Sequence, residues 1–369
     1  MRRVVRTTAN SLLLGRMPKG CQLCTKGAKL VLFVTGMCGR GCYYCPLSER
    51  RRGKDVTYAN EKPVKSERDI IKEAELIDAL GTGLTGGDPS KRFGRVLSYI
   101  RLLKKRFGKN HHIHLYCGGD LSIEQLRKLK RAGLDELRFH TWSAKPVEQA
   151  LKVGIRAGVE IPAIPGTLRR TKNLLRELDR LHCPFVNLNE LEFSDTNLVE
   201  LKARGFKIRS DESMAVKGSE EFARKVLNWA ARNTNLNIHY CPSALKDNVQ
   251  LRNRLRRRAK NVAKPHEVIT EDGLLVKGII HGLPDDKLTA VRRRLIRSYK
   301  IPKELVVIDW DKHRLEMAWQ VAERLAKLEP GLKFGLVEEY PTHDRLETMF
   351  VPLDFSNCDE CKFINRKMN

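Results

Sequence analysis

The sequence predicts an α/β fold, a partial or full (β/α) barrel followed by a C-terminal α+β domain. Between residues 29 and 246, short β-rich apolar segments alternate with helical segments of about 10–15 residues, which favours successive βαβ units and a parallel sheet. After residue 265 the alternation stops, and hairpin-like segments and helices follow in a different order. The change of pattern predicts two domains in one chain.

The barrel segment contains about seven candidate strands, each followed by a glycine, a turn or a helix. They are expected at 29–35, 84–89, 112–117, 136–142, 159–166, 185–193 and 236–243. The helices between them are expected at 67–81, 93–108, 122–133, 146–158 and 168–182. Chemistry in (β/α) barrels lies at the carboxyl ends of the strands, so polar residues at those ends are the first candidates for a site.

Five segments are expected along the chain. They are a basic N-terminal segment with a Cys-x2-Cys pair (1–28), the barrel (29–246), a basic linker or helix (247–265), an α+β accessory domain (266–353) and a C-terminal tail with a second Cys-x2-Cys pair (354–369). Within the accessory domain, a hairpin is expected around Asp272-Gly273, a helix over 313–329 and another hairpin over 334–353.

The charge of the chain is strongly positive. Its 369 residues carry 70 Lys and Arg against 44 Asp and Glu, a formal net charge of +26. Such a surplus attracts polyanions, so RNA is the predicted partner, the alternative being a general effect on solubility. No apolar run reaches the roughly 20 residues that span a bilayer, and the N-terminal LLL falls short of a signal peptide, so no membrane is expected and the predicted location is cytoplasmic.

Three cysteines, Cys38, Cys42 and Cys45, follow the first expected barrel strand with the spacing Cys-x3-Cys-x2-Cys. Iron in a cubane cluster and zinc in a structural site each take four ligands. Three closely spaced thiols without a local fourth therefore indicate a metal position left open for a substrate or cofactor. The alternative is a zinc site that takes its fourth ligand from a distant part of the chain.

This cysteine triplet, with Tyr44 just before its last member, resembles the signature of the radical S-adenosylmethionine (SAM) superfamily. The resemblance implies that Cys38, Cys42 and Cys45 hold three irons of a [4Fe-4S] cluster and that SAM chelates the fourth. It also implies reductive cleavage of SAM to a 5′-deoxyadenosyl radical, with an external electron donor as a partner. The cofactor would carry this chemistry while the protein supplies position and electrostatics.

The segment TGGDP, with Gly86, Gly87 and Asp88, resembles the superfamily's Gly-Gly-acid motif at the end of the second strand. The resemblance implies contact with the methionyl amino group of SAM. Because Asp88 is shorter than the usual glutamate, backbone carbonyls are expected to do more of this work. Strand order assigns His140 and Asn189 to the ribose and adenine, and Gly166 to the segment beside the adenine. For His140 and Asn189 the alternative is a polar rim residue that contacts no ligand.

Several further segments resemble a narrower group of archaeal proteins that is related to pyruvate formate-lyase activating enzymes. They are GCQLCTKGAKLVLFVTGMC, YANE, GLTGGDP, HIHLYC, AGLDELRFH, NLNELEF and EEYPTHDRLE, and together they extend over nearly the whole chain. This resemblance predicts the chemistry and leaves the target open.

A second metal site is expected from the two remaining close-spaced pairs, Cys21 with Cys24 and Cys358 with Cys361. Two Cys-x2-Cys pairs make a complete four-thiolate set for zinc or for a second iron–sulfur cluster. The alternative is that the pairs are unrelated thiols. Cys117 and Cys241 are expected as small buried residues, or else at the mouth of the barrel.

The predicted activity is modification of tRNA or rRNA. It depends on the net charge, the basic segments 50–54 and 252–258, and an appended domain that could hold RNA. The alternative is a protein-directed radical enzyme, such as an activase of a glycyl-radical enzyme or a peptide modifier. A non-catalytic iron–sulfur protein would leave the TGGDP segment unexplained. The sequence predicts neither the attacked atom nor the oligomeric state.

Overall fold

The computed structural model describes residues 2–119, 121–211 and 213–353, and the chain divides into two compact units between Leu251 and Arg252. This division falls inside the basic segment that the sequence analysis placed at 247–265.

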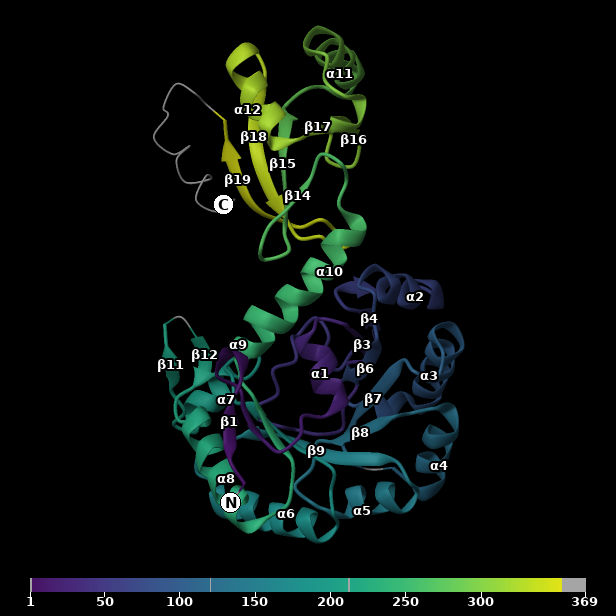
Figure 1. Ribbon diagram of the computed structural model, residues 1–369, viewed down its shortest axis with the longest axis vertical. Helices are drawn as coiled ribbons and strands as arrows, with labels where there is room; N and C mark the ends of the chain where they lie inside the picture. The colour runs from purple at the N-terminus through teal and green to yellow at the C-terminus, as the bar shows by residue number, and fades with distance from the viewer. Residues whose placement is uncertain (1, 120, 212, 354–369) are drawn as a thin grey trace. The chain divides into compact units, whose positions relative to one another are not determined.

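The first unit is built on one curved sheet, whose parallel part has seven strands (Figure 1). These strands are β13 (Ile238–Cys241), β10 (Val186–Glu190), β9 (Arg156–Ala163), β8 (Glu136–Phe139), β7 (His112–Cys117), β6 (Gly81–Gly86) and β3 (Lys29–Thr35), in spatial order. Antiparallel strands extend both edges: β2 (Leu12–Leu14) and β1 (Val4–Arg6) beyond β13, and β4 (Tyr58–Ala59) and β5 (Lys62–Pro63) beyond β3. Within the described residues the sheet does not close, so the α/β prediction is confirmed in its partial-barrel form.

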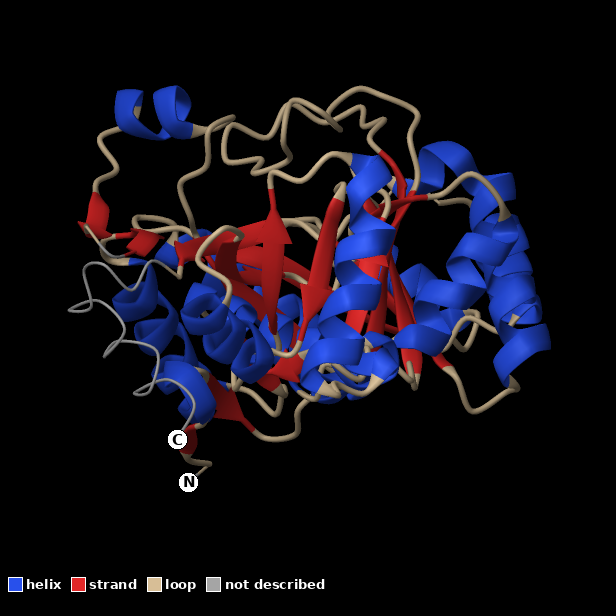
Figure 2. Cartoon of the chain, turned by 90° about the horizontal axis from the view of Figure 1, so that it is seen from above, coloured by secondary structure: helices blue, strands red, loops and turns tan. Residues whose placement is uncertain are grey.

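Helices cover the outer face of this sheet, as Figure 2 shows with strands in red and helices in blue. They are α2 (Glu67–Leu76), α3 (Phe93–Phe107), α4 (Ile123–Ala132), α5 (Lys145–Lys152), α6 (Leu168–Arg180), α7 (Leu198–Ala203) and α8 (Ser219–Asn233). Their apolar stripes are buried, as in α3, where Val96, Ile100 and Leu103 are fully inaccessible. Local signals set the ends of α4: Ser122 and Gln125 form a capping box, and Gly133 ends the helix in the left-handed region.

Helix α1 (Lys19–Thr25) lies inside the arc of strands rather than outside it (Figure 1). It connects β2 at one edge of the sheet to β3 near the other, so the chain crosses the barrel lumen here. Gly20 makes the crossing possible, because a Cβ at this position would lie 2.5 Å from His114 Nδ1 and 2.6 Å from Arg138 Nη2. Residues 1–28, taken from the sequence as a basic N-terminal segment, thus supply two strands and the lumen helix of the first unit.

Short elements complete the first unit. They are the 3-10 turns η1 (Thr8–Asn10) and η2 (Pro89–Arg92), the hairpin β11 (Ile208–Ser210) and β12 (Ser213–Val216), α9 (Ser243–Leu245) and the π-helical turn η3 (Lys246–Leu251). None of the helices in the described part of the chain is both long and apolar enough to cross a bilayer.

The second unit begins with the basic helix α10 (Arg252–Val262), followed by an antiparallel sheet of order β16-β17-β15-β18-β19 with β14 beside β15. The strands are β14 (Val268–Ile269), β15 (Leu275–His281), β16 (Val306–Asp309), β17 (Arg314–Met317), β18 (Lys333–Glu339) and β19 (Glu347–Pro352), with the helices α11 (Asp285–Tyr299) and α12 (Trp319–Leu328) and the turn η4 (Lys303–Leu305). Residues of α11, α12 and one face of the sheet share a core that includes Leu288, Leu325, Ile280 and Leu336.

The helix expected over 313–329 is wrong at its start. Residues Arg314–Met317 form β17, and the helix begins only at Trp319. The four residues alternate as a strand requires: Leu315 and Met317 join the apolar core, whereas Arg314 donates to Glu316 in a buried ionic cluster. Pairing with β15 and β16 therefore overrides the helical propensity of RLEM.

Candidate active site

The loop that carries the cysteine triplet is folded back on the end of β3. Gly36 donates a backbone hydrogen bond to Lys54 O (2.8 Å), and Gly53 donates one to Gly36 O (3.0 Å). A side chain at Gly36 would overlap the carbonyl of Arg51. The loop thus leaves the strand and returns to the same point, which presents the triplet at the carboxyl edge of the sheet.

The three thiols of this loop are reduced and accessible: Cys38 is exposed, and Cys42 and Cys45 are half-buried. Partial burial raises the pKa of Cys38, and the nearby charges of Asp88, Cys42 and Cys45 raise that pKa further. The fold therefore brings together the triplet and the acid of the TGGDP segment. Neutral thiols release their protons when a metal binds them.

The end of β6 fits tightly against the start of this loop. Gly87 donates to Thr35 O and Asp88 donates to Met37 O, both at 2.8 Å. A Cβ at Gly87 would lie 2.6 Å from Met37 O, and one at Gly86, whose φ is 150°, would overlap the carbonyl of Thr35. These two glycines hence let two backbones meet beneath the triplet, a packing role that the sequence analysis did not anticipate.

The carboxylate of Asp88 is buried, and its oxygens accept hydrogen bonds from its own neighbourhood. Oδ1 accepts from the Ser90 amide (3.0 Å) and hydroxyl (2.7 Å), and Oδ2 accepts from the Gly118 amide (3.2 Å). Asp88 thereby caps the turn η2 and ties the ends of β6 and β7 together. Both carboxylate oxygens thus have protein donors, and the contact of backbone carbonyls with SAM stays a prediction.

Two of the predicted site residues touch one another. The Tyr44 hydroxyl and His140 Nε2 lie 3.0 Å apart, and His140 Nδ1 lies 3.0 Å from Glu160 O. Burial lowers the pKa of His140 and raises that of Tyr44, so both side chains are neutral near pH 7. Asn197 Nδ2 and Thr196 Oγ1 donate to Tyr44 O and Cys45 O, which anchors the loop on the segment after β10.

Glu160 is the central residue that the sequence analysis missed. Its carboxylate is buried in the lumen and accepts from Arg138 Nη1, Asn187 Nδ2 and Asn189 Nδ2, each at 2.9 Å. Despite burial, the Arg138 guanidinium and the two amides lower its pKa, so the carboxylate is charged. The Asn189 amide is thus held by Glu160, and its contact with the ribose or adenine stays a prediction. The available signal was a lone acid in the apolar strand VEIPA.

Gly166 and Arg40 lie at the same edge of the sheet. Gly166 is in the turn between β9 and α6, at φ 89°, with open space where a side chain would project. Arg40, from the triplet loop, donates to His140 O (3.3 Å) and lies over Gly118, where a Cβ would overlap its guanidinium. Arg40 places a positive charge beside Asp88 and His140, and no motif in the sequence indicated it.

The second predicted metal site is described in part. Cys21 and Cys24 lie on α1 in the lumen, while Cys358 and Cys361 fall outside the described residues. A thiol not included in that set, Cys241 at the end of β13, lies close enough to Cys21 and Cys24 for their charges to raise its pKa.

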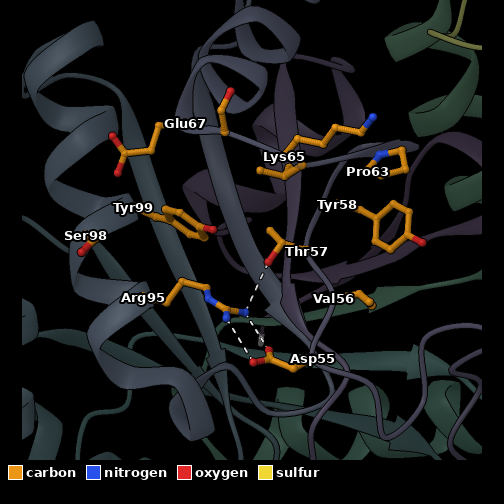
Figure 3. Close-up of a pocket in the computed structure, with 12 residues that line it drawn as sticks. Asp55, Val56, Thr57, Tyr58, Pro63, Lys65, Glu67, Arg95, Ser98 and Tyr99 are labelled. Carbon is orange, nitrogen blue, oxygen red and sulfur yellow. Dashed lines mark hydrogen bonds and ion pairs between the residues drawn. The ribbon is translucent and has the colours of Figure 1, made fainter.

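A surface cavity of about 630 Å³ lies beside the base of the triplet loop (Figure 3). Asp55 joins the two features, because it lines the cavity and its Oδ1 accepts from Thr35 Oγ1 (2.8 Å) at the end of β3. Arg95 closes the same wall through two bonds to the Asp55 carboxylate (2.7 and 3.1 Å). The hydrogen bonds that Arg95 and Arg92 donate to the Asp55 carboxylate lower its pKa.

A cluster of acids in the second unit has its own cation. The ligand atoms of His266, Glu267 and Glu316 lie within 4.8 Å of one another, as a metal site would require. The ammonium of Lys277 occupies this position, 3.3 Å from Glu267, 2.6 Å from Glu316 and 2.9 Å from Glu339. We therefore interpret the cluster as a buried ion-pair network that fixes the sheet.

The family model of the radical SAM superfamily matches residues 32–146, and a model described as a domain of unknown function (DUF8061) matches 273–353. A Methanocaldococcus jannaschii protein named "Putative glycyl-radical enzyme activating enzyme" is 41% identical over 357 residues, which cover 92% of this chain and 93% of the relative.

This chain belongs to the radical SAM superfamily. The radical SAM match includes the triplet loop, the TGGDP segment and His140. Three free, accessible thiols on one loop are the donor set that a [4Fe-4S] cluster with one open iron requires, so the residues present fit the cofactors of a radical SAM enzyme, the cluster and SAM. The chain is therefore an enzyme.

Solved structures give a weaker likeness. The crystal structure of Streptococcus suis SuiB bound to S-adenosylmethionine is 12% identical, with a TM-score of 0.42 and coverage of 58% of this chain and 50% of SuiB. A structure of anSMEcpe with bound AdoMet is 13% identical, with a TM-score of 0.40 and coverage of 57% and 60%. The chain thus spans about half the length of SuiB.

Proposed function

We propose that this chain is a protein-directed radical SAM enzyme, an activase that abstracts a hydrogen atom from the backbone of a partner protein. The observation that carries the proposal is the 41% identity, over nearly the full length of both chains, to a protein named as a glycyl-radical enzyme activating enzyme. This was the alternative target in the sequence analysis, and the relative favours it over RNA.

In this proposal the triplet loop holds the cluster through Cys38, Cys42 and Cys45, with its fourth iron left for SAM. When bound, a cluster reduced by an external electron donor would supply the electron that cleaves SAM to methionine and a 5′-deoxyadenosyl radical, and this radical would take a hydrogen atom from the target to give 5′-deoxyadenosine. Gly86 and Gly87 would position this loop, since a side chain at either residue would overlap the backbone at the end of β3 and the start of the loop.

The residues along the carboxyl edge would orient SAM and exclude competing donors. Tyr44 and His140 hold each other, and His140 is fixed through its second nitrogen by the backbone of β9. Glu160, charged and saturated by three donors, keeps Asn187 and Asn189 in place below them. In the neutral ring Nδ1 donates to the Glu160 carbonyl, so Nε2 accepts from the Tyr44 hydroxyl, and the pair adds no charge beside a sulfonium.

RNA modification, the first prediction from the sequence, has the net charge of +26 in its favour. The comparisons give it no support, because the M. jannaschii relative is named for an activating enzyme. We therefore assign the basic surface no substrate role in this proposal.

The test follows the abstracted hydrogen. The reconstituted enzyme, with SAM and a chemical reductant, is incubated with the protein fraction of cells that make this chain, grown on glycine deuterated at Cα. Deuterium in the 5′-deoxyadenosine, measured by mass spectrometry, is the expected result. An RNA fraction from cells grown on deuterated ribose precursors runs in parallel.

Two controls make the result specific. The Cys42→Ala variant should yield no 5′-deoxyadenosine, and unlabelled protein should yield product without deuterium. Deuterium arriving from the RNA fraction and not from the protein would overturn the proposal in favour of the earlier prediction. Label from neither fraction, with active SAM cleavage, would also contradict it.

A further inference from the structure

Three cysteines that the radical SAM site does not use gather in the barrel lumen. Cys21 and Cys24 are one turn apart on α1, and Cys241 ends β13. Gln250 of the turn η3 links two of them: the Cys24 thiol donates to Gln250 Oε1 (2.7 Å), and Gln250 Nε2 donates to Cys241 Sγ (3.6 Å). We call Cys21, Cys24, Cys241 and Gln250 the lumen thiol cluster.

Polar N–H groups already contact the buried sulfur of this cluster. Cys21 is buried, and its Sγ accepts from Arg138 Nη2 and Asn187 Nδ2, both at 3.4 Å. N–H donors and cations around sulfur favour thiolates once a metal repays their desolvation.

We propose that the lumen thiol cluster binds one thiophilic divalent cation, of the zinc or ferrous iron class. Cys21, Cys24 and Cys241 would supply three thiolates, and Gln250 Oε1 a fourth donor. Three soft ligands and one amide oxygen make a four-coordinate set suited to such a cation and not to magnesium or calcium.

The present geometry indicates how the ion would enter. The three sulfurs do not all lie within 4.8 Å of one another, because the amide of Gln250 stands between Cys24 and Cys241. In the S–H···O contact of Cys24 with Gln250, a cation can replace the proton and bind both atoms. The Gln250 amide nitrogen donates to Cys241 Sγ (3.6 Å), so one side chain contacts two of the three sulfurs.

This site differs from the four-thiolate site predicted from spacing alone. That prediction joined Cys21 and Cys24 to Cys358 and Cys361, whereas the fold brings Cys241, more than two hundred residues from α1, to the same place. The two assignments share α1 and differ in their other thiols, so separate substitutions distinguish them.

The test uses the full chain carrying Cys38→Ala, Cys42→Ala and Cys45→Ala, so that metal at the radical SAM site is removed and the result is independent of the proposed function. The protein is loaded anaerobically with Co²⁺, which reports tetrahedral thiolate ligation through its visible and charge-transfer absorption. One cobalt per chain, measured by elemental analysis, and thiolate-to-cobalt bands are expected.

Substitutions then assign the ligands. Cys241→Ser and, independently, Cys24→Ser should each weaken cobalt binding by at least about tenfold, and Gln250→Leu should keep the thiolate bands while weakening binding to a smaller extent. Cys183→Ser is the matched control: Cys183 is also buried and free, but its thiol donates to the carbonyls of Phe185 and Ala157. Cobalt binding should be unchanged in this control.

Three results would overturn the proposal. They are the absence of thiolate bands, bands that survive both Cys241→Ser and Cys24→Ser, and bands lost in Cys358→Ser or Cys361→Ser but kept in Cys241→Ser. Circular dichroism confirms that each variant is folded. If Cys241→Ser fails to fold, Cys241→Ala and the pair Cys358→Ser with Cys361→Ser decide, because these variants change the thiols in which the two assignments differ.

Discussion

The first unit holds two groups of three cysteines that differ in almost every respect. Cys38, Cys42 and Cys45 lie within one loop, are at least partly exposed and are positioned by backbone hydrogen bonds. The lumen thiol cluster takes its cysteines from α1 and β13 and its glutamine from η3. Side chains from β8 and β10 donate to the sulfur of Cys21.

The difference shows how a chain separates an open site from a closed one. The backbone of the triplet loop packs closely against the end of the sheet at Gly36, Gly86 and Gly87, and its thiols are accessible to a ligand. In the lumen, Arg138 and Asn187 already donate to sulfur, so the cluster is surrounded before any ligand binds. A catalytic metal needs the first arrangement and a structural metal suits the second.

Loss of one triplet cysteine is the largest effect that the comparison predicts. Cys38→Ala, Cys42→Ala or Cys45→Ala should each reduce SAM cleavage to the background rate, because three thiolates are the fewest that leave a single iron open. The measurement is 5′-deoxyadenosine formed per enzyme under dithionite. Full cleavage in any one variant would remove the distinction between the two groups.

Glu160→Gln should have the second largest effect, a loss in the free energy of unfolding. The substitution removes the charge that pairs with buried Arg138, and breaking a buried ion pair costs about 3–5 kcal/mol in the free energy of unfolding. Urea denaturation followed by hydrogen exchange of β8 and β9 measures it. An unchanged midpoint would mean that Glu136 alone compensates the guanidinium.

Gly87→Ala should act on the triplet loop alone. The added methyl group would press on the carbonyls of Met37 and Gly36, and displacing a catalytic loop by about 1 Å can cost roughly 100-fold in rate. The rate of SAM cleavage by cluster-loaded protein is the readout. Gly94→Ala, where nothing lies within 4 Å of the added Cβ, is the control and should retain the rate.

Cys21→Ala should leave SAM cleavage by the folded protein unchanged and is the smallest effect on activity. It removes the acceptor of two buried donors, Arg138 and Asn187, and should lower the free energy of unfolding by about 1–3 kcal/mol. Metal at the lumen thiol cluster should fall with it. Loss of SAM cleavage in a variant that keeps its [4Fe-4S] iron would couple the two groups.

The sequence predicted what depends on local pattern. The alternation of elements yielded all seven parallel strands and the antiparallel hairpins at 268–281 and 333–352, and the spacing of three cysteines drew attention to the loop after β3. The strand Arg314–Met317 was not predicted, because RLEM has helical propensity and forms a strand only through its pairing with β15 and β16. Local pattern is strongest where a feature lies within one element.

Features assembled from distant segments could not be predicted in the same way. Leu12–Leu14 was noted as a short apolar patch, and its role as a strand depends on β13. Glu160 and Cys241 gain their significance from neighbours on other strands. Proximity of this kind comes from the order of strands in the sheet, which a single sequence does not contain.

The edge formed by β1 and β2 has a consequence for how the protein is made. Ser11 bonds His239 and Tyr240, and the partner His239 lies 228 residues later in the chain. At ordinary rates of synthesis, roughly 10–50 s pass between the appearance of the two segments at the ribosome. The first strands made are therefore among the last to find their places, and the thiols of α1 stay accessible until β13 emerges. The proposed lumen metal can therefore reach Cys21 and Cys24 during synthesis as well as in the folded chain.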